Sequence, residues 1–188
     1  MPRLVVFNNI SLDGYFTDAR GDMSWAHKSD PEWNAFVARN VSQAGMLLFG
    51  RVTYELMASY WPTPAAVQAM PDVAKAMNAL PKIVFSTTLG EAAWQNTRLV
   101  RSGLLETVRE LKGNDAGSDI AILGSGKVVA QLAQAGLVDE YQLAVNPVVL
   151  GAGRTIFQGV AGHFALELAN DRRFENGIVV LYLRPARR

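Results

Sequence analysis

The 188-residue chain contains no cysteine, which excludes disulfides, thiolate metal sites and cysteine nucleophiles. It has only two histidines, His27 and His163, which lie far apart in the sequence with no further ligand at a suitable spacing. A zinc site needs three or four donors. The sequence therefore predicts no metal centre.

Charge of one sign and long apolar runs are also scarce. The formal net charge is +1, and Lys and Arg are spread along the chain, which argues against nucleic acid or an anionic membrane as the main partner. No stretch approaches the roughly 20 apolar residues of a membrane span. The apolar run 4–7 is too short for a secretory signal. We therefore expect a cytoplasmic protein with a small-molecule ligand.

The composition is that of a globular protein. Apolar residues make up 49% of the chain and charged residues 19%. A chain of this length buries roughly 70% of its unfolded surface and is most simply one domain. We therefore expect residues 1–188 to form a single domain.

Buried strands and helical periodicities alternate along the first two thirds of the chain. Apolar runs predict strands at 3–7, 46–49, 82–85, 97–100 and 120–123. Between these strands, helical spacing predicts a helix that starts at 31, one at 52–60 and one at 65–80 with a break near Pro71. Two more helices are predicted further along. One follows Ser102, its N-cap, and the other runs from 127 to a left-handed cap at Gly136. This alternation predicts parallel βα units.

The last third of the chain has a different sequence pattern, which favours strands rather than helices. Residues 141–149 are rich in β-formers, with Pro147 marking a bulge or a strand end. Asn176-Gly177 stands between two strand-like runs and predicts a hairpin with a type I′ turn. The expected fold class is therefore α/β, with a mixed, mainly parallel sheet, flanking helices and a C-terminal antiparallel hairpin.

Three predicted strands end in residues suited to phosphate binding. Gly50-Arg51-Val52-Thr53, Ser86-Thr87-Thr88 and Gly124-Ser125-Gly126-Lys127 each follow a strand. The carboxyl ends of parallel strands share one edge of a sheet, where ligands of such sheets bind. Two of these turns open helices, whose N-termini favour anions, and both carry a cation. The pattern predicts a ligand with two or more phosphates.

The segments LLFGRVTYE, IVFSTT and ILGSGKVVAQL, in this order, resemble the nucleotide-binding segments of the dihydrofolate reductase fold. NNISLDGYF and GLVDEYQLAVNPVVLGAGRTIF are typical of a related group, the reductase domain of the bifunctional riboflavin-biosynthesis deaminase–reductase and its stand-alone members. The resemblance implies a dihydrofolate reductase-like three-layer α/β/α sandwich and a homodimer, which late strands often form in such relatives.

The resemblance also implies a cofactor, NADPH in preference to NADH. Gly50, Arg51 and Thr53 match the turn at its pyrophosphate and adenosine side, and Ser86 and Thr87 match the strand end at the adenosine ribose and 2′-phosphate. The glycine-rich turn under the pyrophosphate is matched by Gly124, Ser125, Gly126 and Lys127, with Ser125 in place of a second glycine.

The substrate side is less well marked. Asp13 and Glu32 are candidate proton donors, although Asp13-Gly14 also reads as a turn. Ser29-Asp30-Pro31-Glu32 also spells a capping box, which by itself accounts for Glu32 and is the favoured interpretation, and Asp30 competes for the same roles.

Three further residues are candidates for the substrate pocket or the core. Asn9 and Trp25 are candidate substrate contacts, Trp25 because a loop indole can stack on a flat heterocycle. Trp33 lies on an apolar helix face, which favours core packing.

The predicted activity is an NADPH-dependent reduction. Hydride passes to a pterin-like or pyrimidine-like small molecule, ribosylated or not. The deaminase half is absent from this reductase, because its zinc motif requires cysteine. A non-catalytic nucleotide-binding dimer is the first alternative. Dihydrofolate reductase activity is the second, and it is disfavoured because SLDGYF replaces the proline- and tryptophan-containing loop of those enzymes.

Overall fold

A computed structural model of the protein describes residues 1–26, 30–114 and 117–186. Its strands are β1 (Leu4–Ser11), β2 (Thr17–Asp18), β3 (Met46–Gly50), β4 (Lys82–Phe85), β5 (Thr97–Val100), β6 (Ile120–Leu123), β7 (Glu140–Asn146), β8 (Gly153–Arg154), β9 (Leu166–Arg173) and β10 (Val179–Pro185). Its helices are η1 (Ser24–Ala26), a 3-10 turn, and α1 (Pro31–Gln43), α2 (Arg51–Tyr60), α3 (Pro64–Ala69), α4 (Pro71–Ala79), α5 (Leu104–Lys112) and α6 (Gly126–Gln134). Among these described helices, none has the length and apolar character needed to cross a bilayer.

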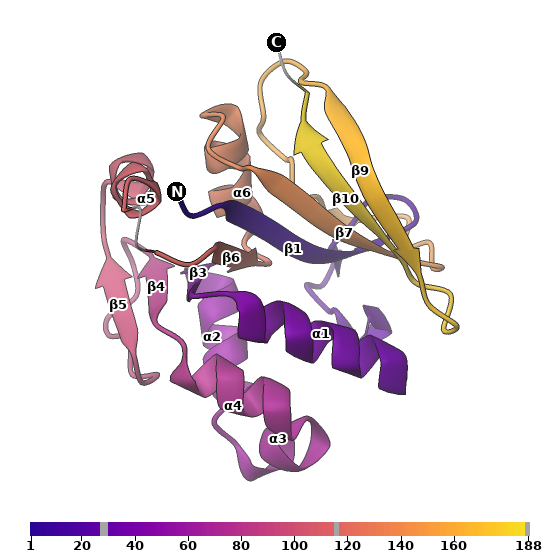
Figure 1. The fold of residues 1–188 in the computed structure, drawn as a ribbon, viewed down its shortest axis with the longest axis horizontal. Helices are drawn as coiled ribbons and strands as arrows, with labels where there is room; N and C mark the ends of the chain where they lie inside the picture. The colour runs from indigo at the N-terminus through magenta and orange to yellow at the C-terminus, as the bar shows by residue number, and fades with distance from the viewer. Residues whose placement is uncertain (27–29, 115–116, 187–188) are drawn as a thin grey trace.

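The main sheet has the strand order β5-β4-β3-β6-β1-β7-β10-β9 (Figure 1). Neighbours from β5 to β7 are parallel, and β10 runs antiparallel to both β7 and β9. Helices α1 to α4 lie on one side of the sheet, and α5 and α6 lie on the other. The predicted three-layer sandwich, with a mainly parallel sheet and a C-terminal antiparallel hairpin, is confirmed.

The central strands are apolar on both faces because helices cover both. Leu48 of β3 belongs to the core beneath α5 and α6, together with Val129 and Leu132. Its neighbours Leu47 and Phe49 point to the opposite core, beneath α2 and α4. This two-sided burial explains why the strands appear in the sequence as continuous apolar runs.

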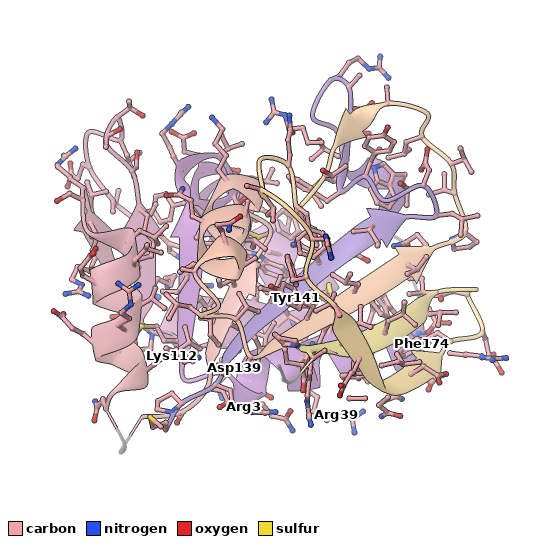
Figure 2. The ribbon with its side chains drawn as sticks, turned by 90° about the horizontal axis from the view of Figure 1, so that it is seen from above. Arg3, Arg39, Lys112, Asp139, Tyr141 and Phe174 are labelled. Carbon is pink, nitrogen blue, oxygen red and sulfur yellow. The ribbon has the colours of Figure 1, made fainter. Side chains whose placement is uncertain are left out.

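A third core cluster lies between α1 and the strands β7 and β10, and aromatic rings form much of it. Trp33 is 5% exposed and meets Phe174 edge-on at a centroid distance of 5.1 Å, with Phe36 and Phe7 completing the cluster. Figure 2 shows Phe174 at the turn between β9 and β10. The prediction that Trp33 packs in the core is confirmed.

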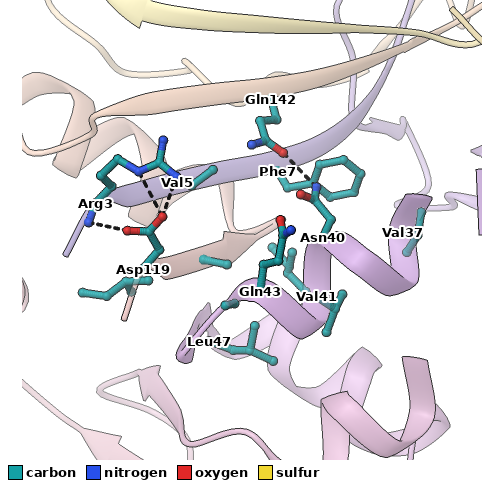
Figure 3. A pocket seen from close by; sticks show the side chains of 14 residues that line it. Arg3, Val5, Phe7, Val37, Asn40, Val41, Gln43, Leu47, Asp119 and Gln142 are labelled. Atoms are coloured by element: carbon teal, nitrogen blue, oxygen red, sulfur yellow. Dashed lines mark hydrogen bonds and ion pairs between the residues drawn. The ribbon is translucent and has the colours of Figure 1, made fainter. Parts of the chain in front are cut away.

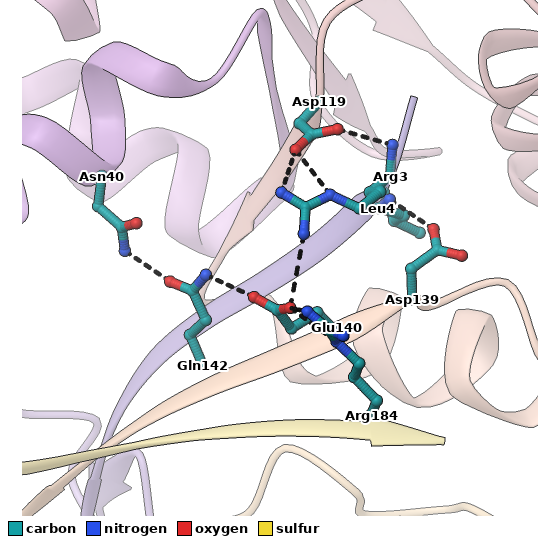
Figure 4. A network of polar contacts seen from close by, with 8 residues as sticks. All are labelled: Arg3, Leu4, Asn40, Asp119, Asp139, Glu140, Gln142 and Arg184. Carbon is teal, nitrogen blue, oxygen red and sulfur yellow. Dashed lines mark hydrogen bonds and ion pairs between the residues drawn. The ribbon is translucent and has the colours of Figure 1, made fainter. Parts of the chain in front are cut away.

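A polar network joins the amino ends of three parallel strands to β10 (Figure 4). The Arg3 guanidinium donates to Asp119 at 2.6 Å and lies 3.6 Å from Glu140. Glu140 is buried, and it also accepts from Arg184 at 3.0 Å and from Gln142 at 2.9 Å. The buried carboxylate is thus surrounded by donors.

Two predicted helix caps are wrong. The N-cap of α1 is Asp30, whose carboxylate accepts from the Trp33 N–H at 2.7 Å, while Ser29, the predicted capping residue, lies outside the described residues. The N-cap of α5 is Gly103 rather than Ser102. Gly103 adopts φ +72°, a left-handed conformation that glycine reaches without strain.

The hairpin between β9 and β10 is confirmed, but the type I′ turn is wrong. A type I′ turn needs positive φ at both central residues, and here Gly177 has φ +86° whereas Asn176 is not among the positive-φ residues. The Gly177 N–H donates to the Phe174 carbonyl, and the Phe174 N–H to the Ile178 carbonyl. This is a three-residue loop with glycine at the left-handed position.

Some strand limits also differ from those predicted. β1 continues through Asn8 and Asn9 to Ser11 because buried partners satisfy the polar side chains. Between β1 and α1, where the sequence pattern predicts neither helix nor strand, the described residues form β2 and η1. β7 ends at Asn146, directly before Pro147, which cannot donate to a ladder.

Candidate functional site

The three predicted phosphate turns meet at one edge of the sheet. β4, β3 and β6 are adjacent and parallel, so the turns that follow them lie side by side. The helices α2 and α6 both start at this edge. The sequence-based prediction that these turns gather is therefore confirmed.

Ser125 links the first turn to the third. Its hydroxyl oxygen accepts from the Gly50 N–H at 2.7 Å, and its own N–H donates to Thr53 Oγ1 at 3.0 Å. The residue is buried and left-handed, with φ +63°, and a Cβ added at Gly124 would lie 2.9 Å from the Thr53 side chain. Small residues thus let the two turns interlock, and the Ser125 hydroxyl is used inside the protein.

Cations and free backbone donors remain at this edge. The first N–H groups of a helix have no partner within the helix, which applies here to α2 and to Gly126 and Lys127 of α6. Lys127 is exposed, and among the described residues it forms no ion pair. Arg51 is about half exposed and pairs with Glu55 at 3.0 Å, one helical turn on. The edge is therefore suited to anionic oxygen atoms.

The middle turn contributes hydroxyls. Ser86 Oγ accepts from the N–H groups of Thr88 and Leu89, at 3.1 and 2.9 Å, and so shapes the turn after β4. Thr87 is exposed, and its hydroxyl bonds to none of the described residues. Thr88 is exposed as well, so the hydroxyls of Thr87 and Thr88 are both available to a ligand.

Asp13 holds two loops together beside this edge. Its carboxylate accepts from the Ser11 hydroxyl at 2.6 Å, from the Gly151 N–H at 2.8 Å and from the Leu150 N–H at 3.1 Å. The hydrogen bond from Ser11, followed by those from the backbone, holds the pKa of Asp13 below its ordinary value. Asp13 is therefore ionised at neutral pH and acts in the structure as a loop organiser.

Phe16 connects the same loop to the glycine-rich turn. Its N–H donates to the Arg154 carbonyl at 2.9 Å, within the small β2–β8 sheet. A Cβ added at Gly126 would lie 2.9 Å from the Phe16 ring. The segments typical of the reductase group thus border the start of α6.

The other predicted substrate-side residues have structural partners. Glu32, half exposed, accepts from Arg172 of β9 at 2.8 Å. Trp25 lies in η1, half-buried, and its indole N–H donates to the Asp22 carbonyl at 3.2 Å. Asp30 caps α1. None of these contacts brings Glu32 or Trp25 onto the phosphate turns.

Three asparagines lie where β1 and β7 end, and the sequence analysis singled out only Asn9. Asn8 is buried, and its amide lies 3.5 Å from the Gly124 carbonyl. Asn146 is fully buried and donates to Asn9 Oδ1 at 3.2 Å. The signal in the sequence was polar residues continuing two strands otherwise made of apolar residues.

A cavity of about 60 Å³ lies elsewhere, between the second half of α1 and the sheet (Figure 3). Two polar pairs line it: Asn40 donates to Gln142 at 2.8 Å, and Arg3 binds Asp119. The volume exceeds the roughly 10–15 Å³ that one water needs. This cavity lies beside the amino ends of β1 and β6, whereas the phosphate turns are at the carboxyl ends.

Comparison with known proteins places these features in a wider group. The family model of the RibD C-terminal domain matches residues 2–180. Uncharacterized protein YyaP of Bacillus subtilis (strain 168) is 30% identical over 177 residues, 94% of this chain and 92% of that protein.

Solved structures share the fold. A candidate riboflavin biosynthesis protein from Shewanella sp. PV-4 superposes with a TM-score of 0.74 at 22% identity, covering 98% of this chain and 99% of that one. The diaminohydroxyphosphoribosylaminopyrimidine deaminase/5-amino-6-(5-phosphoribosylamino)uracil reductase of Thermotoga maritima gives 0.72 at 17% identity, covering 98% of this chain and 57% of that one.

Proposed function

Because the chain belongs to the family of RibD C-terminal domains, we propose that it is an NADPH-dependent reductase of a ribosylated, pyrimidine-like small molecule. One observation carries the proposal most directly. Two helix-opening turns interlock through Ser125, and each presents a cation, Arg51 or Lys127, at the same sheet edge. A dinucleotide has two phosphates between its nucleosides, and a ligand of this kind fits such a pair of turns.

The residues at the edge divide naturally along such a cofactor. Lys127 and the free N–H groups of α6 would hold the pyrophosphate, and Arg51 would reach a phosphate from α2. Thr87 would meet the adenosine ribose or its 2′-phosphate. When bound, NADPH supplies hydride, and the protein contributes position and the exclusion of water.

The proton needed after hydride transfer does not come from Asp13 in this proposal. A carboxylate with a lowered pKa is ionised at neutral pH and has no proton to donate. Asp13 instead fixes the loop that carries Leu150 and Gly151. Replacing Asp13 with Asn would therefore disturb loop geometry rather than remove an acid.

Titration of the purified protein with NADPH and NADH, followed by nucleotide fluorescence, tests the cofactor half. Arg51→Ala and Lys127→Ala should each weaken NADPH binding about tenfold, since a charge-assisted phosphate contact contributes roughly 1.4 kcal/mol or more. Arg98→Ala, an exposed arginine on β5, is the control and should leave the affinity unchanged. If the wild-type protein binds neither nucleotide, the proposal is wrong.

Glu55 offers a sharper version of the same experiment. Arg51 must leave Glu55 to reach a phosphate, so Glu55→Gln should tighten NADPH binding about twofold, since exposed helical pairs contribute roughly 0.3–0.5 kcal/mol. The gain should vanish in the Arg51→Ala background. An equal gain in both backgrounds would mean that general charge, rather than Arg51, is responsible.

A non-catalytic nucleotide-binding protein is the second candidate. It is favoured by the engagement of both predicted acids, Asp13 with two loops and Glu32 with Arg172. The two candidates differ in turnover. Oxidation of NADPH in the presence of ribosylated aminopyrimidines supports the reductase, and tight binding without oxidation supports the binding protein.

A further inference from the structure

The carboxyl ends of β1 and β7 carry a pair of amides whose orientation is determined by their surroundings. The two strands are parallel, with Asn9 opposite Ala144 and Ser11 opposite Asn146. Side chains alternate along a strand, so Asn9 and Asn146 lie on the face that α1 covers, as do Phe7 and Ala144. The pair therefore lies just beyond the aromatic cluster, at the edge where the phosphate turns gather.

Asn146 can adopt only one amide orientation. Its nitrogen lies 3.0 Å from the Ala144 carbonyl, 3.2 Å from Asn9 Oδ1 and 3.4 Å from the Ile10 carbonyl. These atoms are acceptors, so rotating the amide would place an oxygen against them. Its own Oδ1 is buried and has no hydrogen-bond partner among the described residues, which is an unfavourable state for a core amide.

The orientation of Asn146 in turn fixes that of Asn9. Because Asn9 Oδ1 accepts from Asn146, the NH₂ group of Asn9 points away from it. Asn9 is only half-buried, and its Nδ2 donates to none of the described residues. Asn9 therefore presents two N–H donors at this edge, while its carbonyl oxygen is turned toward Asn146.

We propose that Asn9 contacts the ligand as a hydrogen-bond donor and that Asn146 is its positioning residue. Together they make the substrate side select a ring that carries a carbonyl oxygen over the same ring with an amino group there. Phe7 precedes Asn9 by two residues on the same face and contacts Trp33 at 6.3 Å between centroids, so an apolar aromatic surface borders the donor. The inference rests on the proposed function, whose cofactor half is measured separately.

Isothermal titration with two matched pyrimidines tests this assignment. 5,6-Diaminouracil carries ring carbonyls, and 2,4,5,6-tetraaminopyrimidine carries amino groups at those positions. The NADPH-loaded wild type should bind the uracil at least tenfold more tightly. Asn9→Asp, which replaces the donor with an acceptor, should reverse the preference, and Asn9→Leu should abolish it.

Asn146→Ala tests the positioning role. It releases Asn9, so the preference for the uracil should fall about fivefold without reversing. Asn40→Asp is the matched control, because Asn40 forms another amide pair on the same face, with Gln142, at the opposite end of the strands. Asn40→Asp should keep the wild-type preference, and all four variants should keep wild-type affinity for NADPH.

The outcomes separate this inference from the proposed function. If Asn9→Asp and Asn9→Leu keep the wild-type preference, or if the wild type binds neither pyrimidine while still binding NADPH, the assignment of Asn9 is wrong and the cofactor site stands. If NADPH itself does not bind, the proposed function fails, and this inference fails with it.

Discussion

Lys82 is buried almost completely, at 1% exposure, and its ammonium donates to the carbonyls of Met77, Asn78 and Leu80 at the end of α4. Burial lowers the pKa of Lys82 to about 8. Between pH 8 and 10.5 the unfolded chain therefore binds the proton more tightly than the folded chain. The free energy of unfolding should rise by about 3 kcal/mol across this range through Lys82 alone.

Urea unfolding at pH 7.5, 9 and 10.5 measures this effect as the difference between the wild type and Lys82→Met. The difference should change with pH in the direction that favours the wild type as the pH rises. Lys75→Met, on the exposed face of α4, should give no such trend. A constant difference for Lys82→Met would show that folding does not change the protonation of this lysine.

Asp30 is the N-cap that the spacing predicts at Ser29, and Glu32, the predicted capping-box partner, pairs with Arg172. Asp30→Ala should lower the free energy of unfolding by about 1 kcal/mol because it removes the N-cap of α1. Glu32→Gln removes an exposed pair with Arg172 and should change the same quantity by less than about 1 kcal/mol. Thermal or urea unfolding ranks the two, and a larger loss for Glu32→Gln would restore the capping-box interpretation.

At the scale of elements, the β9–β10 hairpin depends on one glycine. Gly177 has φ +86°, and a Cβ there would lie 3.1 Å from Pro147, in the loop after β7. Gly177→Ala should therefore destabilise the protein by about 2 kcal/mol, through both left-handed strain and this contact. Gly136→Ala, with φ +66° and open space around it, isolates the strain and should lose about 1 kcal/mol. If urea unfolding showed equal losses of stability for Gly177→Ala and Gly136→Ala, the contact with Pro147 would not contribute to the destabilisation.

Elements whose local and tertiary preferences agree could be predicted from the sequence. β4 and β6 coincide with their apolar runs, because both faces of these strands are buried. The end of β1 could not be predicted, because Asn8 and Asn9 are acceptable in a strand only once Gly124 and Asn146 are beside them. The polarity of Asn8 and Asn9 favours a loop after residue 7, but their hydrogen-bond partners, which are distant in the sequence, stabilise the strand.

In the candidate site too, the features that depend on local sequence could be predicted, and those that depend on distant contacts could not. The phosphate turns were found because each is a local strand–turn–helix pattern. The role of Ser125 could not be found, because its partners Gly50 and Thr53 lie more than 70 residues away in the chain. Asp13 read equally well as acid or turn former, and only the contacts from Leu150 and Gly151 separate these roles.

For the whole molecule, the resemblance predicts a homodimer, and β9 is the end strand of the sheet. Leu168 on this strand is 58% exposed, and free strand edges invite pairing. Sedimentation equilibrium should show a dimer that Leu168→Glu weakens at least tenfold. Val67→Glu, an equally exposed apolar position on α3, is the control. A monomeric wild type, or an equal effect at Val67, would contradict dimerisation through β9.

The position of β1 in the sheet has a consequence for biosynthesis. β1 is synthesised before its neighbours in the sheet, β6 and β7, with Leu4 paired to Ile120 and Val5 to Glu140. At roughly 5–20 residues per second, the wait for β7 is on the order of 7–27 seconds. Until β6 has been made, this apolar strand has neither of its neighbours, although β3, β4 and β5 are made before β6, and it still lacks one neighbour until β7 follows. Because exposed apolar strands in incompletely folded chains are the species that chaperones bind, we expect holding chaperones to bind β1 in the nascent chain until β7 has been made.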